Sequence, residues 1–380
     1  MALRGFERVS SVEKILIVSR NHPPLWGGME RLNRHLVEEL AARVKEVRLI
    51  APEGAADHAP PGVAVTQVPL RPVSRFLLLA GWRAIRLARA WNPDLILAGS
   101  GLMAPPVLMA ARLCGARAAV YAHGLDLTVP HPVYRTFWRP ALRRLDTVVA
   151  NSQATARLAE AIGVAAERID VVHPGVRLSV PDPEARRRFR DRHGLGDAPV
   201  LLSVGRLTTR KGLREFVREV LPRIVASHPE TRLVVIGDVA ANALYAKAQT
   251  WESIVDAAES VGVAKHLCFL GQRFGRELSD AYEGADLHVF PVRRIPDDPE
   301  GFGMVSVEAA AHGLATVAYA TGGVVDAVGV GESGRLVDPG DARGFAEAVC
   351  ASLRNPLPRD RIRRFAEQFA WPVFGEKLYR

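Results

Sequence analysis

Two glutamates flank a glycine-rich turn in the stretch DDPEGFGMVSVEAAAHG (297–313). Glu300 lies on a predicted loop, and Glu308 lies about one turn into a helix that we predict to begin near Met304. The free N–H groups at a helix start suit an anion such as phosphate. A carboxylate is repelled by phosphate but makes charge-assisted hydrogen bonds to hydroxyls. The pair therefore indicates a ligand with hydroxyl groups on both sides of a diphosphate, which is the chemistry of a nucleotide sugar.

Cations and glycines stand at two other predicted loops. Arg206 directly follows a predicted strand in SVGRLTTRKGLREF (203–216), and Lys211 comes shortly after it, before a predicted helix. Two cations at the carboxyl end of a strand can neutralise a diphosphate. Gly27 and Gly28 also precede a predicted helix, where backbone amides can approach a phosphate closely.

Each of these features has a simpler interpretation on its own. The glycine pair is consistent with a tight turn, because neither the G-x-G-x-x-G nor the G-x-x-x-x-G-K-[ST] pattern occurs there. The cations are consistent with an ordinary basic loop, and the glutamates with a helix cap and a surface ion pair. A ligand site is favoured because all of these residues fall at predicted loops or helix starts.

The loops that carry these residues can form one site only if regular strands and helices bring them close together. Short runs rich in β-branched residues alternate with amphipathic helical patterns, which is typical of parallel strands and the helices that cover them. We predict strands at 14–19, 46–51, 63–68, 94–99, 118–123 and 147–152, and again at 199–205, 232–237, 266–271, 286–291 and 315–320. This repeated alternation predicts the α/β class, with two doubly wound Rossmann-like domains facing a cleft.

The stretch 173–199 is rich in proline, glycine and charge and has no strand pattern, so it is typical of a linker with one short helix. We expect an N-terminal acceptor-binding domain over 1–177 and a nucleotide-sugar-binding domain over 178–358. We expect the remainder, 359–380, to form a C-terminal helix that packs back toward the N-terminal domain.

The composition excludes several classes of protein. The chain is 48% hydrophobic and has three scattered cysteines, which fits a globular protein without a disulfide framework or zinc site. No apolar run approaches the ~18 residues that span a bilayer, and the first dozen residues lack the apolar core of a signal peptide. We therefore expect a cytoplasmic protein. Glycine and proline are ordinary in number and spread along the chain, so the sequence is neither collagen-like nor of low complexity.

The net positive charge of the chain comes entirely from its first half. Residues 1–180 contain 23 Lys and Arg against 14 Asp and Glu, whereas residues 181–380 contain 27 of each. An excess of this kind either solubilises the protein or meets an anionic partner, such as nucleic acid or acidic lipid. No nucleic-acid-binding motif is present, so we expect no nucleic-acid partner.

One segment in this half, RFLLLAGWRAIRLARAW (75–91), is typical of a helix that lies on anionic lipid. At about 100° per residue its basic and apolar side chains share one stripe. The stripe comprises Arg75, Leu79, Trp82, Arg83, Arg86 and Arg89. A second basic-aromatic cluster occurs at 134–144. The alternative is a helix that packs on the sheet and exposes its arginines to solvent. We hypothesise a peripheral contact with the inner face of the cytoplasmic membrane through Trp82 and the three arginines that follow it.

The segment EGFGMVSVE resembles the E-x7-E motif of a large family of retaining, GT-B glycosyltransferases, which includes bacterial lipopolysaccharide and phosphatidylinositol mannosyltransferases. The resemblance covers nearly the whole chain. Similar segments are PPLWGGMERLNRHL, AHGLDL (122–127), VANS (149–152), VVHPGV (171–176), SVGRLTTRKGL and TGGVVDAVGVGESGRLVDPGD (321–341). Asp326 stands where the family more often has glutamate, and GLATV (313–317) replaces Gly-Thr-Pro-Val.

The resemblance implies a role for each residue that matches a motif. It implies that Arg206 and Lys211 hold the donor diphosphate and that the amides of Gly27 and Gly28 approach it. It assigns Glu300 to the donor sugar and Glu308 to the ribose hydroxyls. It implies that Phe302 and Gly303 present backbone N–H groups beside the sugar, that His123 lies near the reacting carbon, and that Asp126 contacts the acceptor or donor.

These roles predict a retaining hexosyltransferase that needs no metal ion and no cofactor. The donor is a UDP-sugar or GDP-mannose, and the acceptor is a hydroxyl of a glycan or lipid-linked molecule in cell-envelope polysaccharide or glycolipid synthesis. In this family retention is usually described as same-face attack: the acceptor attacks the sugar from the face that the leaving group departs from, without a covalent intermediate. Two alternatives are a nucleotide-sugar epimerase of the same architecture and a non-catalytic nucleotide-sugar-binding partner.

Overall fold

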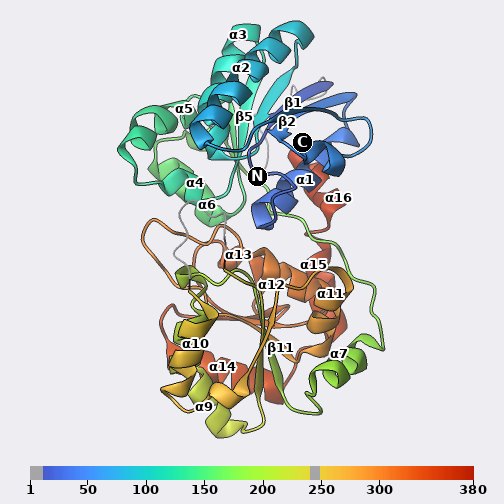
Figure 1. Ribbon diagram of the computed structural model, residues 1–380, viewed down its shortest axis with the longest axis vertical. Helices are drawn as coiled ribbons and strands as arrows, with labels where there is room; N and C mark the ends of the chain where they lie inside the picture. Colours follow the sequence, from blue (N-terminus) through green and yellow to red (C-terminus); the bar gives the residue numbers. More distant parts are fainter. Residues whose placement is uncertain (1–11, 240–248) are drawn as a thin grey trace. The chain divides into compact units, whose positions relative to one another are not determined.

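The computed structural model describes residues 12–239 and 249–380, and the chain divides into two compact units. The first unit extends to Gly175 and also takes in Trp371–Arg380, and the second comprises Val176–Ala370. Each unit is built on a parallel β-sheet with helices on both faces (Figure 1). The predicted α/β class with two doubly wound units is therefore confirmed.

The sheet of the first unit has seven strands among the described residues, in the order β3-β2-β1-β4-β5-β6-β7. The strands are β1 (Lys14–Val18), β2 (Glu46–Pro52), β3 (Ala64–Val68), β4 (Leu95–Ala98), β5 (Arg117–Ala122), β6 (Thr147–Ala150) and β7 (Ile169–Val171). The helices are α1 (Gly28–Ala41), α2 (Val73–Trp91), α3 (Ala104–Cys114), α4 (Leu125–Thr128), α5 (Arg139–Leu142), α6 (Gln153–Ala161) and α16 (Trp371–Tyr379). The central strands are apolar and almost continuously buried, because helices cover both of their faces.

The sheet of the second unit has six strands among the described residues, in the order β10-β9-β8-β11-β12-β13. The strands are β8 (Val200–Val204), β9 (Arg232–Ile236), β10 (Leu267–Gly271), β11 (Leu287–Phe290), β12 (Thr316–Tyr319) and β13 (Gly334–Val337). The helices are α7 (Ala185–His193), α8 (Leu213–Glu219), α9 (Leu221–Ser227), α10 (Trp251–Glu259), α11 (Gly275–Gly284), α12 (Met304–Ala311), α13 (Val324–Ala327), α14 (Ala342–Arg354) and α15 (Arg359–Glu367). Residues of α8, α10 and α14 share one hydrophobic core with the sheet, and residues of α7, α11 and α12 share another.

The strand orders locate the edge at which a ligand is expected. In the first sheet the order reverses between β1 and β4, and in the second it reverses between β8 and β11. In open α/β sheets, ligands bind outside the carboxyl ends of the strands at such a switch point. The loops that follow β8 and β11 carry Arg206, Lys211 and Glu300, so the second sheet places these three residues at its switch point.

The structure differs from the sequence-based expectation in two places. The short strands β7 and β13 were not predicted, because each is brief and carries charged or glycine residues among its apolar ones. The expected single helix over 359–380 is two helices. The first, α15, belongs to the second unit, whereas α16 belongs to the first unit and packs on α1.

Candidate donor-binding site

Two loops of the second unit, 205–212 after β8 and 291–303 after β11, are joined by direct contacts. The Arg293 amide donates to the carbonyl of Arg210 over 2.8 Å. A Cβ at Gly212 would lie 2.1 Å from the carbonyl oxygen of Pro291, and the φ of Gly212 is 69°. Only glycine fits this close approach in a left-handed conformation. The two loops therefore form one framework for the charged residues that they carry.

Glu300 lies at the centre of this framework and is only 9% exposed. Its Oε2 atom is 2.9 Å from Nζ of Lys211 and 3.3 Å from Nε of Arg210. Burial acts to raise the pKa of Glu300, but the charges of Lys211, Arg210 and the more distant Arg206 outweigh it and lower that pKa to about 2. The carboxylate is therefore ionised and acts as a hydrogen-bond acceptor.

Lys211 is held between Glu300 and an aromatic ring. Its ammonium group lies 4.5 Å from the ring centroid of Phe290, within the range of a cation–π contact. Burial lowers the pKa of Lys211, and the negative charge of Glu300 opposes this shift. An anion bound beside Lys211 would further favour its charged form, so the site is electrostatically suited to phosphate.

Arg210 is a site residue that the sequence analysis missed. Its guanidinium donates to Oδ1 of Asp298 over 3.0 Å and to the carbonyl of Pro299 over 2.7 Å, which fixes the chain just before Glu300. Arg206, which was predicted, is exposed but close enough to lower the pKa of Glu300. The signal available in the sequence was the neighbouring Arg-Lys pair, of which only the lysine was chosen.

The turn after Glu300 starts helix α12. Gly303 is the residue before the helix and has a φ of 93°, and a Cβ there would lie 2.9 Å from the Phe290 ring. Phe302 is buried with its ring centroid 5.7 Å from that of Phe369. Phe302 is thus anchored by its side chain, and its backbone lies at the N-terminal end of α12.

Glu308 lies one turn into α12, as predicted, and is half-buried. Its Oε2 accepts a hydrogen bond of 3.2 Å from the hydroxyl of Tyr282 on α11. The second unit therefore places Arg206, Lys211, Glu300 and Glu308 on the loops and helix starts at the carboxyl end of one sheet.

A second glycine turn, at residues 321–323, packs against the backbone of the loop that carries Glu300. The amide of Gly323 donates to the carbonyl of Glu300 over 3.0 Å, and a Cβ at Gly323 would lie 1.9 Å from the carbonyl oxygen of Gly301. The hydroxyl of Thr321 donates to the carbonyl of Val292 over 2.9 Å. The Thr-Gly-Gly segment thus fixes the backbone that carries Glu300.

In the first unit, His123 stands at the carboxyl end of β5 and is 7% exposed. Its Nε2 lies 3.0 Å from the carbonyl oxygen of Gly99, and since a carbonyl only accepts, we assign the proton to Nε2. Asp126 accepts from the amide of His123 over 2.9 Å and from the amide of Gly101 over 2.8 Å. Asp126 therefore organises the backbone around His123, a structural role that the sequence did not reveal.

The glycine turn of the first unit also holds an acid that the sequence analysis did not consider. Helix α1 begins at Gly28 after Gly27, as expected, and Glu30 lies in its first turn. Oε1 of Glu30 accepts from the side-chain amide of Asn21 over 2.8 Å. The carboxylate already interacts with the positive end of α1, so a phosphate bound here would share that end with Glu30.

The basic helix α2 exposes part of the predicted stripe. Trp82 is 52% exposed, and the guanidinium of Arg86 lies 4.7 Å from its ring centroid, while Arg89 is also exposed. Arg83 is instead tied to the backbone of Gln67 by a hydrogen bond.

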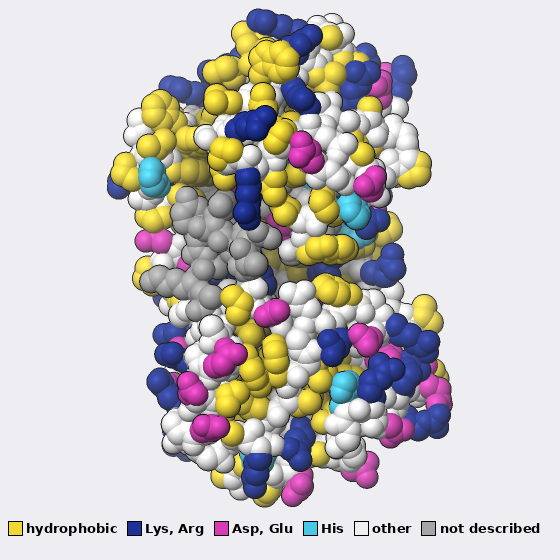
Figure 2. Space-filling model, viewed as in Figure 1, with side chains coloured by type: hydrophobic (Ala, Val, Ile, Leu, Met, Phe, Trp, Pro, Cys, Tyr) yellow, Lys and Arg dark blue, Asp and Glu magenta, His cyan; other side chains and the backbone are white. Residues whose placement is uncertain are grey.

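One assignment in the stripe was wrong. Leu79 packs against the core, and it is Leu78, 74% exposed, that stands at the surface. Figure 2 shows hydrophobic and basic side chains mixed over α2 and α3.

Two features that would point to particular partners are absent from the described residues. No group of three or more His, Cys, Asp or Glu side chains in the described ranges is arranged to hold a metal ion. Within those ranges, no helix has the length and apolar character needed to cross a bilayer.

The chain matches two family models that divide it near the linker. Residues 26–180 match Glycosyltransferase Family 4, and residues 185–369 match Glycosyl transferases group 1. The chain is 31% identical to a GDP-mannose-dependent alpha-(1-6)-phosphatidylinositol monomannoside mannosyltransferase of Mycolicibacterium smegmatis, over 90% of each chain. A Mycobacterium tuberculosis protein of the same description is 30% identical, over 97% of each chain.

Solved structures of similar fold include Anabaena HepE in complex with UDP, with a TM-score of 0.79 and 19% identity, covering 96% of this chain and 98% of that one. WaaG, a glycosyltransferase involved in lipopolysaccharide biosynthesis, has a TM-score of 0.71 and 19% identity, with the same two coverages. These neighbours share the fold, and the mycobacterial relatives are similar in sequence over nearly all of the chain. The chain therefore belongs to the family-4-type glycosyltransferases of the GT-B fold.

Proposed function

We propose that this glycosyltransferase moves a hexose, with retention of configuration and without a metal ion, from a nucleotide diphosphate sugar to a hydroxyl of a glycan or lipid-linked acceptor. The observation that carries the proposal is the position of Glu300, an ionised buried carboxylate within 3.3 Å of both Lys211 and Arg210. Cations beside an acid at one switch point match a ligand that presents both phosphate and hydroxyl groups.

The leaving group of such a reaction is a nucleoside diphosphate, and negative charge develops on its oxygens as the glycosidic bond breaks. Lys211 and Arg206 are the cations that would stabilise this charge, together with the backbone amides at the start of α12. The sugar passes through an oxocarbenium-like state, as in glycoside hydrolysis. Glu300 would accept hydrogen bonds from its hydroxyls.

Three further assignments rest on the family resemblance. We assign Glu308 to the ribose of the donor, His123 to the transferred sugar, and Gly27 with Gly28 to the diphosphate. Glu308 lies on α12 with its carboxylate held by Tyr282, and His123 lies at the carboxyl end of β5. These placements at helix starts and strand ends support the assignments.

Both GDP-mannose and a UDP-hexose are candidate donors. The mycobacterial relatives are described as GDP-mannose-dependent, whereas a solved structure of the same fold holds UDP-glucose. The relatives are described as acting on phosphatidylinositol monomannoside. A lipid-linked acceptor and a peripheral contact with an anionic membrane through α2 are therefore part of the proposal.

The test is a thermal-shift panel of GDP-mannose, GDP-glucose, UDP-glucose and UDP-galactose against the wild type and Glu300→Gln. A donor present at 100 times its Kd adds about 2.7 kcal/mol of stability, which a melting curve resolves easily. We expect one donor to stabilise the wild type strongly and Glu300→Gln much less. If no nucleotide sugar stabilises the wild type, the proposal is wrong.

Product analysis with the stabilising donor completes the test. A new glycoside with the anomeric configuration of the donor, read from its one-bond C1–H1 NMR coupling, supports retaining transfer. An isomerised donor would indicate an epimerase instead, and donor binding without transfer in the presence of membrane extracts would indicate a non-catalytic partner. Activity that persists in excess EDTA supports independence from metal ions.

A further inference from the structure

Helix α11 reaches the carboxylate of Glu308 through one buried side chain. Tyr282 is 1% exposed, and its hydroxyl donates to Oε2 of Glu308 over 3.2 Å. A buried phenol needs a hydrogen-bond partner, and here that partner is the acid assigned to the donor ribose. The E-x7-E motif does not predict this contact, because Tyr282 and Glu308 lie on different helices.

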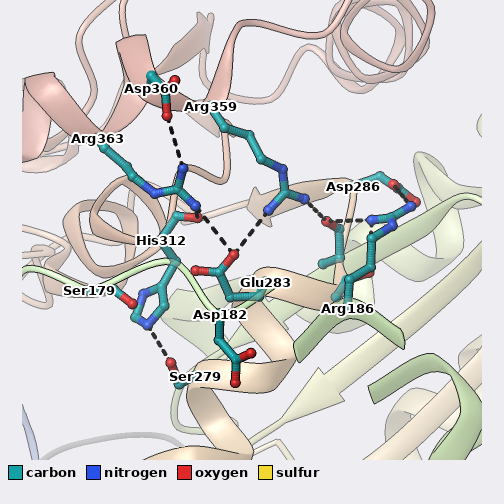
Figure 3. Close-up of polar contacts among 12 residues, drawn as sticks. Ser179, Asp182, Arg186, Ser279, Glu283, Asp286, His312, Arg359, Asp360 and Arg363 are labelled. Atoms are coloured by element: carbon teal, nitrogen blue, oxygen red, sulfur yellow. Dashed lines mark hydrogen bonds and ion pairs between the residues drawn. The ribbon is translucent and has the colours of Figure 1, made fainter. Parts of the chain in front are cut away.

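The ring of Tyr282 is itself held in place by His312, the residue after the last turn of α12. The two rings are stacked, with centroids 5.0 Å apart and planes inclined by 20°. His312 is fixed at both nitrogens. Its Nδ1 lies 2.8 Å from the carbonyl oxygen of Glu308. Its Nε2 lies 2.9 Å from Oγ of Ser279, as Figure 3 shows. The carbonyl can only accept, so Nδ1 carries a proton and the imidazole has one orientation.

The end of α12 is also tied to α15. The guanidinium of Arg363 donates to the carbonyl of His312 over 3.2 Å and pairs with the buried carboxylate of Glu283 at 3.3 Å. Arg359 pairs with the same carboxylate oxygen at 3.4 Å (Figure 3). Because Glu283 follows Tyr282 directly on α11, this network fixes the positions of α11, α12 and α15 around the tyrosine.

We propose that Tyr282 is a positioning residue which orients the carboxylate of Glu308 and thereby makes the site selective for ribonucleotide over deoxyribonucleotide donors. The proposal rests on the proposed function, because it takes the ribose as the partner of Glu308. It adds a residue outside the E-x7-E motif to the donor site and gives it a measurable effect on specificity.

The physical reason is the freedom of a glutamate side chain. An unconstrained carboxylate rotates about its terminal bond and changes rotamer, and this freedom must be lost when it binds a ribose hydroxyl. A hydrogen bond from a rigid, stacked phenol fixes the carboxylate plane before the ligand arrives. Without that bond Glu308 remains charged, but its attraction for the hydroxyl is less directional.

The test measures binding of UDP and GDP, and of their 2′-deoxy and 3′-deoxy analogues, to the wild type and Tyr282→Phe by calorimetry. For the nucleotide that binds, we expect the wild type to prefer the ribo form by about tenfold over the weaker deoxy analogue. In Tyr282→Phe, which keeps the stacked ring, we expect this preference to fall to about twofold. An unchanged preference in a folded Tyr282→Phe variant overturns the proposal.

Controls separate positioning from a loss of folding. Tyr319→Phe removes a buried phenol from the same unit, but its ring packs on Phe345 of α14 in a different hydrophobic core from Tyr282, so it should keep the full ribo preference. In a Glu308→Gln background, Tyr282→Phe should cause no further loss of preference, since its effect acts through that carboxylate. An additional loss in this background would show that Tyr282 acts independently of Glu308 and would overturn the proposal.

Two outcomes remain to be distinguished. If Tyr282→Phe does not fold, Tyr282→Met provides the same test, because it also removes the hydroxyl and leaves Glu308 unchanged. The proposal then predicts loss of ribo preference, whereas retained preference would overturn it. If the wild type binds neither UDP nor GDP, the proposed function itself is wrong. If it binds one of them but Tyr282→Phe keeps the ribo preference, only the role of Tyr282 is wrong.

Discussion

At the scale of single residues, the candidate donor site is built on a buried ion pair whose two members have different proposed partners. Lys211 and Glu300 neutralise each other at 2.9 Å, while the proposal assigns one to phosphate and the other to sugar hydroxyls. Arg210 lies against the same carboxylate oxygen, so Glu300 would keep a cationic neighbour if Lys211 turned to a bound phosphate. The carboxylate of Glu300 would therefore have a cationic partner both with and without a bound donor.

The pair should show strong coupling in a double-mutant cycle. Lys211→Met leaves a buried carboxylate with fewer cations, and breaking such a pair costs about 3 kcal/mol of unfolding free energy. The double variant Lys211→Met with Glu300→Gln should recover part of this loss, because no unpaired charge remains. Urea denaturation of the wild type, the two single variants and the double variant measures this coupling free energy. Additive effects would mean that the two side chains do not stabilise each other.

The low pKa of Glu300 predicts a pH dependence of stability. Its pKa is lowered from 4.5 to about 2, so the folded state favours the ionised carboxylate. The associated stability should be complete above pH 4.5 and should be lost as the pH falls toward 2. Glu300→Gln should therefore show a smaller loss of unfolding free energy over this range than the wild type. Parallel acid profiles for the two proteins would contradict this prediction.

At the scale of elements, the Thr-Gly-Gly turn before α13 determines where the Glu300 loop lies. Gly323→Ala keeps a permitted backbone conformation, since its φ is −76°, but places Cβ 1.9 Å from the carbonyl oxygen of Gly301. We expect the loop to shift, donor affinity to fall by at least tenfold, and stability to fall by about 1–3 kcal/mol. Calorimetry with the donor and urea denaturation measure the two effects.

A glycine elsewhere provides the control for this substitution. Gly340→Ala forces alanine into a φ of 89°, which strains the backbone, but its Cβ would have no atom within 4 Å. It should lower stability and leave donor affinity unchanged. Equal losses of affinity in the two variants would show that the Gly323 contact has no specific effect on the donor site.

Helix α2 is the element to which the membrane hypothesis belongs. Replacing Arg75, Arg86 and Arg89 by Gln should reduce flotation with anionic liposomes, since each basic residue near an anionic surface contributes about 1 kcal/mol. A charge-matched triple at the exposed residues Arg343, Arg354 and Arg361 of the second unit should float like the wild type. If the wild type binds anionic and neutral vesicles equally, the membrane hypothesis is wrong.

At the scale of the whole molecule, the sequence predicted the parts that depend on local pattern. Runs such as KILIVS and RLVVIG identified buried strands, and the E-x7-E stretch predicted correctly that a loop with Glu300 leads into a helix with Glu308. The missed residues act through contacts between distant segments. Arg210 lies 90 positions before the acid that it supports, and Tyr282 lies on a different helix from Glu308. Local periodicity has no information about such pairs.

The chain path makes the first unit depend on its last residues. The described chain passes into the second unit after Gly175 and returns to the first at Trp371, so α16 completes a fold that begins some 350 residues earlier. Trp371 stacks on His35 of α1 with ring centroids 4.0 Å apart. Phe374 is 1% exposed, and its ring centroid lies 6.0 Å from that of Tyr121.

Phe374→Ala should therefore destabilise the first unit and spare the donor-binding residues of the second. Removing a fully buried phenylalanine costs about 3–5 kcal/mol, since it leaves a cavity beside Tyr121 and Trp371. We expect calorimetry to show a lower Tm, with nucleoside diphosphate affinity unchanged at temperatures below the transition. Phe137→Ala, at a position 63% exposed in the same unit, should leave the Tm unaltered. A full loss of nucleotide binding in folded Phe374→Ala would mean that the second unit cannot hold its ligand by its own residues.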